Sequence, residues 1–148
     1  MLSANARLAV NANISGIVAN VGQAVYDSVD EGCAMIKDRA QEIVPVDTGA
    51  LRESIDYQVY RGIQNIERGG SIGGSAFSVT GIVQPDEPYA AYVEFGTGIR
   101  GASSPGAGAG PYSSTWPGMP AQPYMRPALD ESRDSILDLF RANISVAI

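Results

Sequence analysis

The chain has 148 residues, a length that fits one domain with a modest core. Its net charge is −6 and its basic residues are not clustered, which argues against a protein that grips nucleic-acid phosphates. Histidine is absent and Cys33 is the only cysteine, which excludes histidine-based nucleophile pairs, most zinc sites and an internal disulfide. No secretory signal and no long apolar run is visible, so no membrane partner is expected.

The N-terminal segment has no proline from about residue 3 to residue 43, and its apolar residues recur every three or four positions. This stripe comprises Ile14, Val18, Val21, Val25, Val29, Cys33, Ile36, Ala40 and Ile43. The period predicts one long helix, of which about 35 residues would span roughly 50 Å. A compact domain of this length is roughly 40 Å across, so the helix is expected to overhang and to be covered by another copy. The alternative is a break at Gly22 or Gly32 that folds the segment into a hairpin.

The stretch "VPVDTGALRESI", residues 44–55, predicts a sharp stop followed by a second, short helix. Pro45 disfavours helix at the residue before it and so ends the first helix. Asp47 is expected to cap the second helix through its carboxylate, with residues 48–50 as the first turn. Leu51 then lies on the buried face.

The apolar period changes to two in the next segments, which predicts two antiparallel strands. They are "SIDYQVYRGI" and "AFSVTGIVQ", in which Phe77, Val79 and Val83 alternate with polar residues. The glycine-rich stretch between them is expected to form a flexible hairpin tip. Gly81 is a candidate β-bulge.

The segment "PDEPYAAYVEFGTG" is expected to form a short helix, with Gly96 as its C-terminal cap. Tyr89 and Tyr92 are part apolar and part polar, which suits an edge that becomes an interface. Glu94 is either a solvated charge or the partner of an arginine, Arg126 or Arg52.

Residues 98–123 are rich in glycine and proline and are expected to form a long loop that neighbouring molecules hold in place. Its expected anchors are Tyr112, Trp116 and Met119. A C-terminal helix is predicted over about 127–144, with Pro127 in its first turn. Its expected buried stripe is Leu129, Ile136, Phe140 and Ile144. The sequence therefore predicts a single α+β domain over 1–148.

Three of these segments occur in a characteristic order: "VPVDTGALRESI" at 44–55, "YAAYVEFGTG" at 89–98 and "PAQPYMRPALDE" at 120–131. Together they resemble the signatures of the head–tail joining, or tail-completion, proteins of long-tailed bacteriophages. Any one alone is a weak signal, but the three in this order are fairly specific. The chain departs from the family pattern in its longer loop between Thr97 and Pro120.

The resemblance implies an α+β subunit whose copies form a ring, expected to be a hexamer, in the virion neck between head and tail. It implies a structural protein, made in the host cytoplasm, with no catalytic residues, no cofactor and no metal. The implied partners are further copies, a neighbouring connector or stopper, the tail terminator and the tail tube, and DNA would pass through without specific binding. The motif residues with expected structural or interface roles are Pro45, Asp47, Thr48, Gly49, Leu51, Tyr89, Tyr92, Glu94, Gly96, Thr97, Trp116, Pro120, Pro123, Arg126 and Pro127.

Three alternatives remain open at this point. A tail terminator or stopper ring would use a similar α+β subunit. A peptide-binding module would use the 98–123 loop to hold an extended chain. A metal-dependent hydrolase would use Asp47, Glu53 and Asp56 as carboxylate ligands.

Overall fold

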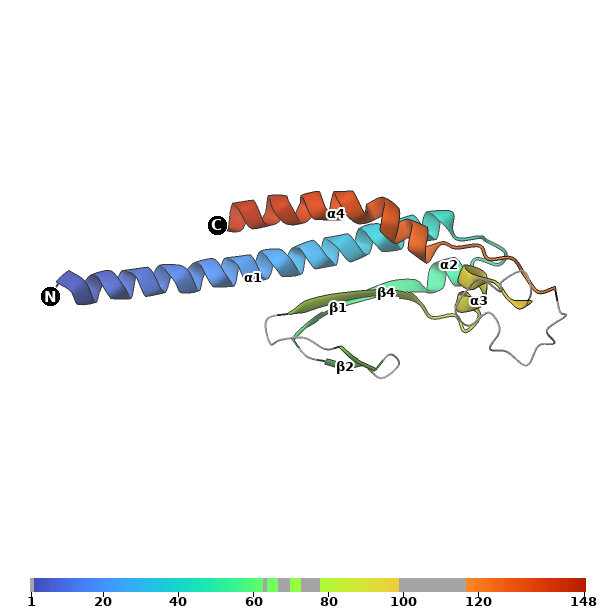
Figure 1. The fold of residues 1–148 in the computed structure, drawn as a ribbon, viewed down its shortest axis with the longest axis horizontal. Helices are drawn as coiled ribbons and strands as arrows, with labels where there is room; N and C mark the ends of the chain where they lie inside the picture. The colour runs from blue at the N-terminus through green and yellow to red at the C-terminus, as the bar shows by residue number, and fades with distance from the viewer. Residues whose placement is uncertain (1, 63, 67–69, 73–77, 99–116) are drawn as a thin grey trace. The chain divides into compact units, whose positions relative to one another are not determined.

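The computed structural model describes residues 2–62, 64–66, 70–72, 78–98 and 117–148, with the backbone alone described for 2–15, 64–66 and 70–72. The elements in chain order are α1 (Leu2–Ile43), α2 (Ala50–Ser54), β1 (Ile55–Arg61), β2 (Gln64–Ile66), β3 (Gly70–Ile72), β4 (Val79–Pro85), α3 (Ala90–Phe95) and α4 (Met125–Ala147) (Figure 1). The predicted α+β class is confirmed: β1 and β4 form a two-stranded antiparallel sheet, and helices precede and follow it.

Helix α1 is continuous over 42 residues, which corresponds to a length of about 63 Å at 1.5 Å per residue. Gly22 and Gly32 lie inside it without ending it, so the hairpin alternative is wrong. The helix ends at Ile43 and its last turn closes with the bond from Val44 N to Ala40 O at 2.9 Å, directly before Pro45. Proline therefore ends the helix as predicted.

Two compact units divide the chain, each built from segments that are distant in sequence. The first comprises residues 1–33, 58–82 and 134–148, and the second comprises residues 34–57 and 83–133. The buried core of the second unit is Ala40, Val44, Leu51, Ile55, Ala90, Tyr124 and Ala128. Half-buried Ile36, Ile43, Val83, Val93 and Met125 surround it.

In the first unit, glycines permit close packing against α1. A Cβ atom added to Gly81 would lie 2.2 Å from Cys33 Sγ and 2.9 Å from Val29 Cγ1. Gly81 is therefore required by the closeness of β4 to α1. The bulge at Gly81 stays a prediction. A Cβ on Gly32 would lie 3.2 Å from Ile136 Cγ2 of α4. Cys33 is buried and its pKa is raised, first by burial and then by the charge of Asp30, in keeping with a packing role.

The glycine-rich stretch between the main strands contains a second small hairpin. Strand β2 pairs antiparallel with β3, with Gln64 opposite Ile72 and Ile66 opposite Gly70. The sequence pattern predicts only a turn here, because three-residue strands interrupted by glycine pairs give no period-two signal. Phe77, expected on the second main strand, lies outside the described residues.

Helix α4 begins at Met125 and continues to Ala147. Leu129 is 50% exposed, so its predicted place on the buried stripe is wrong. Ala128 and Ser132 occupy that face instead, because small residues allow the helix to approach the core closely. The predicted residues Ile136, Phe140 and Ile144 are half-buried.

Candidate functional site

The three motif segments meet in the core of the second unit, although they are far apart in sequence. Leu51 and Ile55 come from the first segment, Ala90 from the second, and Tyr124 and Ala128 from the third. Each of the five has at most 6% of its surface exposed. The motifs therefore specify one packed junction, which we call the motif junction.

Glu94 is the charged residue at this junction, and it is only 8% exposed. Its Oε2 accepts hydrogen bonds from the backbone N–H groups of Tyr124 at 2.7 Å and Met125 at 2.9 Å, and its Oε1 accepts from Arg126 N at 3.1 Å. These donors lie at the N-terminus of α4, where a carboxylate is favoured by the free amides and by the helix dipole. Within the described part of the chain neither alternative holds: Glu94 is buried rather than solvated, and its bond to Arg126 is to the backbone N–H rather than to the guanidinium. A pairing of Glu94 with an arginine of another copy stays a prediction.

Glu94 supplies the acceptor for the backbone N–H groups that begin α4. A helix leaves its first N–H groups without partners inside the helix. Glu94 takes those of Met125 and Arg126, Pro127 has none, and Ala128 N donates to Tyr124 O at 3.2 Å. The sequence "YMRPA" therefore needs only one external acceptor.

Tyr124 fills the centre of the motif junction, with none of its surface exposed. Its hydroxyl lies 3.5 Å from Ala90 O, which it faces as a donor. Burial, and to a lesser degree the charges of Glu94 and Tyr89, raise the pKa of Tyr124 to about 12. The phenol therefore stays protonated and acts as a packing residue with a polar end.

The start of α2 differs from the prediction. The helix begins at Ala50, and Gly49 precedes it in a left-handed conformation with φ of 89°. Asp47 is exposed and no side chain caps the helix, so the predicted Asp47 cap is wrong. Thr48 Oγ1 instead accepts a long hydrogen bond of 3.4 Å from Ala50 N. The positive φ of residue 49 explains why glycine occupies that position, because glycine adopts this conformation without steric cost.

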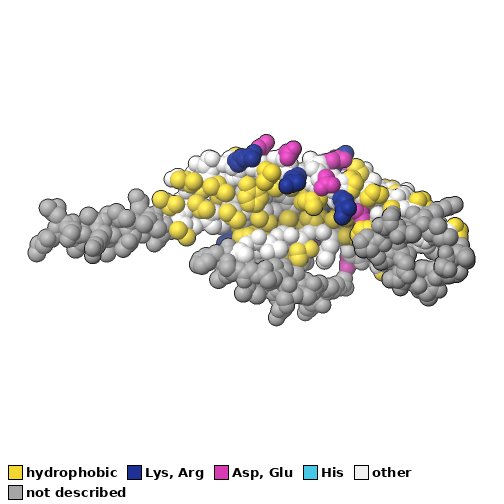
Figure 2. Space-filling view, viewed as in Figure 1, with side chains coloured by type: hydrophobic (Ala, Val, Ile, Leu, Met, Phe, Trp, Pro, Cys, Tyr) yellow, Lys and Arg dark blue, Asp and Glu magenta, His cyan; other side chains and the backbone are white. Residues whose placement is uncertain are grey.

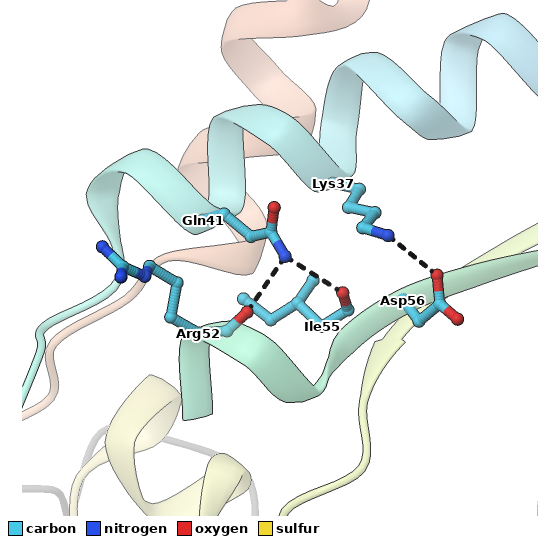
Figure 3. A network of polar contacts seen from close by, with 5 residues as sticks. All are labelled: Lys37, Gln41, Arg52, Ile55 and Asp56. Atoms are coloured by element: carbon cyan, nitrogen blue, oxygen red, sulfur yellow. Dashed lines mark hydrogen bonds and ion pairs between the residues drawn. The ribbon is translucent and has the colours of Figure 1, made fainter. Parts of the chain in front are cut away.

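The end of α2 is held by α1 (Figure 3). Gln41 Nε2 donates to Arg52 O at 3.0 Å and to Ile55 O at 3.3 Å, which satisfies carbonyls at the point where α2 passes into β1. Lys37 pairs with Asp56 at 3.0 Å, and its hydrogen bond lowers the pKa of Asp56. Two successive turns of α1 therefore fix the first residues of β1.

A backbone clamp closes the chain after α3. Gly96 caps α3 as predicted, with φ of 75° and its N–H on Tyr92 O at 2.8 Å. Thr97 and Met119 then exchange two backbone bonds, from Thr97 N to Met119 O at 2.8 Å and from Met119 N to Thr97 O at 3.2 Å. Gly118 has φ of 63°, and a Cβ there would lie 1.8 Å from Thr97 O. We call this pair the Thr97–Met119 clamp.

The clamp shows that one predicted anchor of the 98–123 segment, Met119, lies at its base. The other two predicted anchors, Tyr112 and Trp116, lie outside the described residues, as does most of the segment offered as a peptide-binding loop. Gln122 N donates to Val93 O at 2.8 Å, so the returning chain is held along α3 before it reaches Tyr124.

The remaining predicted residues lie at the surface or near it. Exposed positions are Pro45, Asp47, Thr48, Tyr89, Tyr92, Pro120, Pro123 and Arg126, and Pro127 is half-buried. Gly49, Gly96 and Thr97 are buried. Within the described ranges, no three residues of the types His, Cys, Asp or Glu are grouped so that they could hold a metal ion. In the same part of the chain, no helix is both long enough and apolar enough to cross a membrane.

Comparison with known proteins places the chain in a phage family. Residues 9–96 match the family model HK97-gp10_like, described as "Bacteriophage HK97-gp10, putative tail-component". The comparisons with curated proteins and with solved structures gave no match. The matched range is more than half of the chain and runs from α1 through α3, so it includes the first motif and Glu94. The third motif lies beyond it but packs in the same core. The chain therefore belongs to the HK97-gp10-like family of bacteriophage proteins.

Proposed function

We propose that the chain is a structural subunit of the phage neck, acting as one connector domain that assembles into a ring, expected to be a hexamer, between head and tail. The observation that carries this proposal is the family match over α1 to α3, extended by the third motif in the same core. A phage tail component has its place in the virion, and the joining role is the finer step that we propose.

The hydrogen bonds that fix the angles between elements of the second unit support a structural role in a ring. Gln41 fixes the passage from α2 into β1, and Glu94 fixes the start of α4. A ring closes only if each subunit presents its contacting surfaces at the same angle. Hydrogen bonds at the turns between elements hold such angles, most strongly where they are buried, as is the bond from Tyr124 N to Glu94, because breaking a buried bond leaves unsatisfied groups.

Exposed apolar residues in the N-terminal half of α1 support the expectation that a neighbouring molecule covers this helix. Ile17 is 40% exposed and Val18 is 57% exposed. Val18 belongs to the stripe that the sequence pattern predicts to be covered by another copy. The same surface is open to another virion protein, so the ring itself has to be tested directly.

The direct test is a phage with a stop codon early in this gene. Loss of a head–tail joining subunit should leave filled heads and full-length tails that remain separate, and purified protein added to the mixed lysate should restore joined particles. Normal, infectious particles without the protein would refute the proposal.

The same experiment separates the nearest alternatives. Loss of a tail terminator should give tails of abnormal length, because nothing then ends the growing tube. Loss of a stopper should give heads that release their DNA. Each outcome would retain the virion role but replace the joining role.

The charge of the chain suits a channel through which DNA passes. With a net charge of −6, a ring of this chain would repel phosphates and would not hold the duplex. We expect no measurable binding of the purified protein to duplex DNA at physiological salt. Tight binding in that experiment would contradict a passive channel.

A further inference from the structure

The two parts of helix α4 are held by different kinds of contact. Residues 125–133 belong to the second unit and residues 134–147 to the first. In the second unit, Glu94 accepts hydrogen bonds from N–H groups at the start of the helix, and Ala128 and Ser132 are buried. This part of α4 can be displaced only if the motif junction opens.

The part of α4 in the first unit packs on α1 through half-buried side chains. None of residues 134–147, all of which the structure describes, is buried. Ile136 lies against Gly32, and Asn143 Nδ2 donates a hydrogen bond to Ser28 Oγ at 3.1 Å. Figure 2 shows charged side chains along the outer side of α4 and hydrophobic side chains toward α1. This part of the helix can therefore separate from α1 without opening a buried core.

Ser28 is fully buried on the side of α1 that faces α4. Its hydroxyl donates to Ala24 O, one turn earlier in the same helix, at 2.7 Å. The hydroxyl hydrogen is thereby used, and the oxygen is left to accept the amide of Asn143. The net contribution of such a bond is modest, because both groups can bond to water when the helices separate.

We propose that residues 134–147 form a latch, which opens by local unfolding as one unit while residues 125–133 stay in place. The hydrogen bond between Asn143 and Ser28 is the catch of this latch. In its closed position the latch covers Ser28, so its opening decides whether this face of α1 is accessible. The latch is a property of the single subunit, so it stands or falls independently of the proposed ring.

Amide hydrogen exchange of the purified full-length protein tests the latch, under conditions in which exchange reports the opening equilibrium. Amides of residues 136–144 should exchange at least about tenfold faster than those of residues 128–133, because the latter open only with the core. Their opening equilibria should be close to one another, because the segment opens as a unit. Equal protection in both parts, or protection that declines residue by residue toward the end of the helix, would overturn the proposal.

Two substitutions test the catch from opposite sides. Ser28→Ala changes α1 alone, so any effect on α4 must pass through the contact between the helices. Asn143→Ala places a better helix former in α4, so propensity alone would slow exchange there. We expect each variant to speed exchange of residues 136–144 by about two- to tenfold, the effect of one lost hydrogen bond, and to leave residues 128–133 unchanged. The double variant should match the single ones, because both remove the same bond.

The matched control is Arg141→Ala, which breaks an exposed ion pair with Asp138 inside the latch and should leave the exchange rates nearly unchanged. Circular dichroism of the purified variants shows that each keeps its fold. Unchanged exchange in Ser28→Ala, slower exchange in Asn143→Ala, or an equal rise in both parts of α4 would show that the bond does not hold the latch.

Discussion

The Glu94 cap makes the sharpest prediction about stability. Replacing Glu94 with alanine removes the acceptor for three backbone N–H groups, those of Tyr124, Met125 and Arg126. A buried donor left without a partner costs about 1–3 kcal/mol, and water entering the space made by the truncation recovers part of that loss. We expect Glu94→Ala to lower the free energy of unfolding by about 3–5 kcal/mol, a large part of the stability of a small domain.

Glutamine at this position separates charge from shape. The amide oxygen can keep the two bonds that Oε2 accepts, but the amide NH₂ then faces the N–H of Arg126, donor against donor. We expect Glu94→Gln to cost about 2 kcal/mol, less than alanine but clearly more than a surface change. The matched control is Glu42→Gln, which removes an exposed carboxylate paired with Arg39 and should cost less than about 1 kcal/mol.

Urea unfolding followed by far-ultraviolet circular dichroism measures these differences, and amide hydrogen exchange localises them. Exchange should rise at Tyr124, Met125 and Arg126 in both Glu94 variants and stay unchanged in the control. If Glu94→Ala and Glu42→Gln prove equally stable, the carboxylate does not hold the start of α4 and the explanation of the second motif is wrong.

Three further perturbations test the packing. Gly81→Ala should cost about 1–3 kcal/mol because its new Cβ overlaps the Cys33 sulfur, and Cys33→Ala should restore part of this loss in urea unfolding. Gly118→Ala should lower the thermal midpoint through about 1–3 kcal/mol of strain at positive φ, whereas Gly22→Ala, with open space around it in α1, should be neutral or raise stability by up to about 1 kcal/mol. Burial raises the pKa of the Tyr124 phenol from an ordinary 10.0 to about 12 in the folded chain, so its contribution to stability is complete below pH 10 and is lost as the pH rises from 10 through about 12. Unfolding measured across that range should show this loss, and Tyr124→Phe should abolish it.

Local signals in the sequence are sufficient to predict where the helices lie. The period of α1 and the position of Pro45 depend on neighbouring residues only, so the length and the end of this helix follow directly from them. The cap at Gly96 is equally local, because a glycine directly after a short helix takes up the positive φ. The start of α2 shows the limit of such rules. Asp47 and Thr48 compete for the same role, and Gly49 shifts the first turn so that neither carboxylate nor hydroxyl serves as a full cap.

The motif junction depends on contacts between distant residues, and these were not predictable from one sequence. Glu94 lies 30 residues before Tyr124 in the chain, and nothing in the neighbourhood of Glu94 indicates a partner. The signal that was available lies at the other end, where a helix begins without Ser, Thr, Asp or Asn as its cap and therefore needs an acceptor from elsewhere. Leu129 was misplaced for a related reason: hydrophobicity favours it for the core, but the closeness of packing selects Ala128.

The Thr97–Met119 clamp has a consequence for how related proteins can diverge. Because both ends of the intervening chain are fastened to each other and to α3, its length is decoupled from the packing of the core. Closing a longer loop is inexpensive in entropy, at only about 0.6 kcal/mol for each doubling of its length. Insertions and deletions can accumulate between these two fixed points without altering the scaffold, so related chains can differ in this stretch while they keep the same packed core.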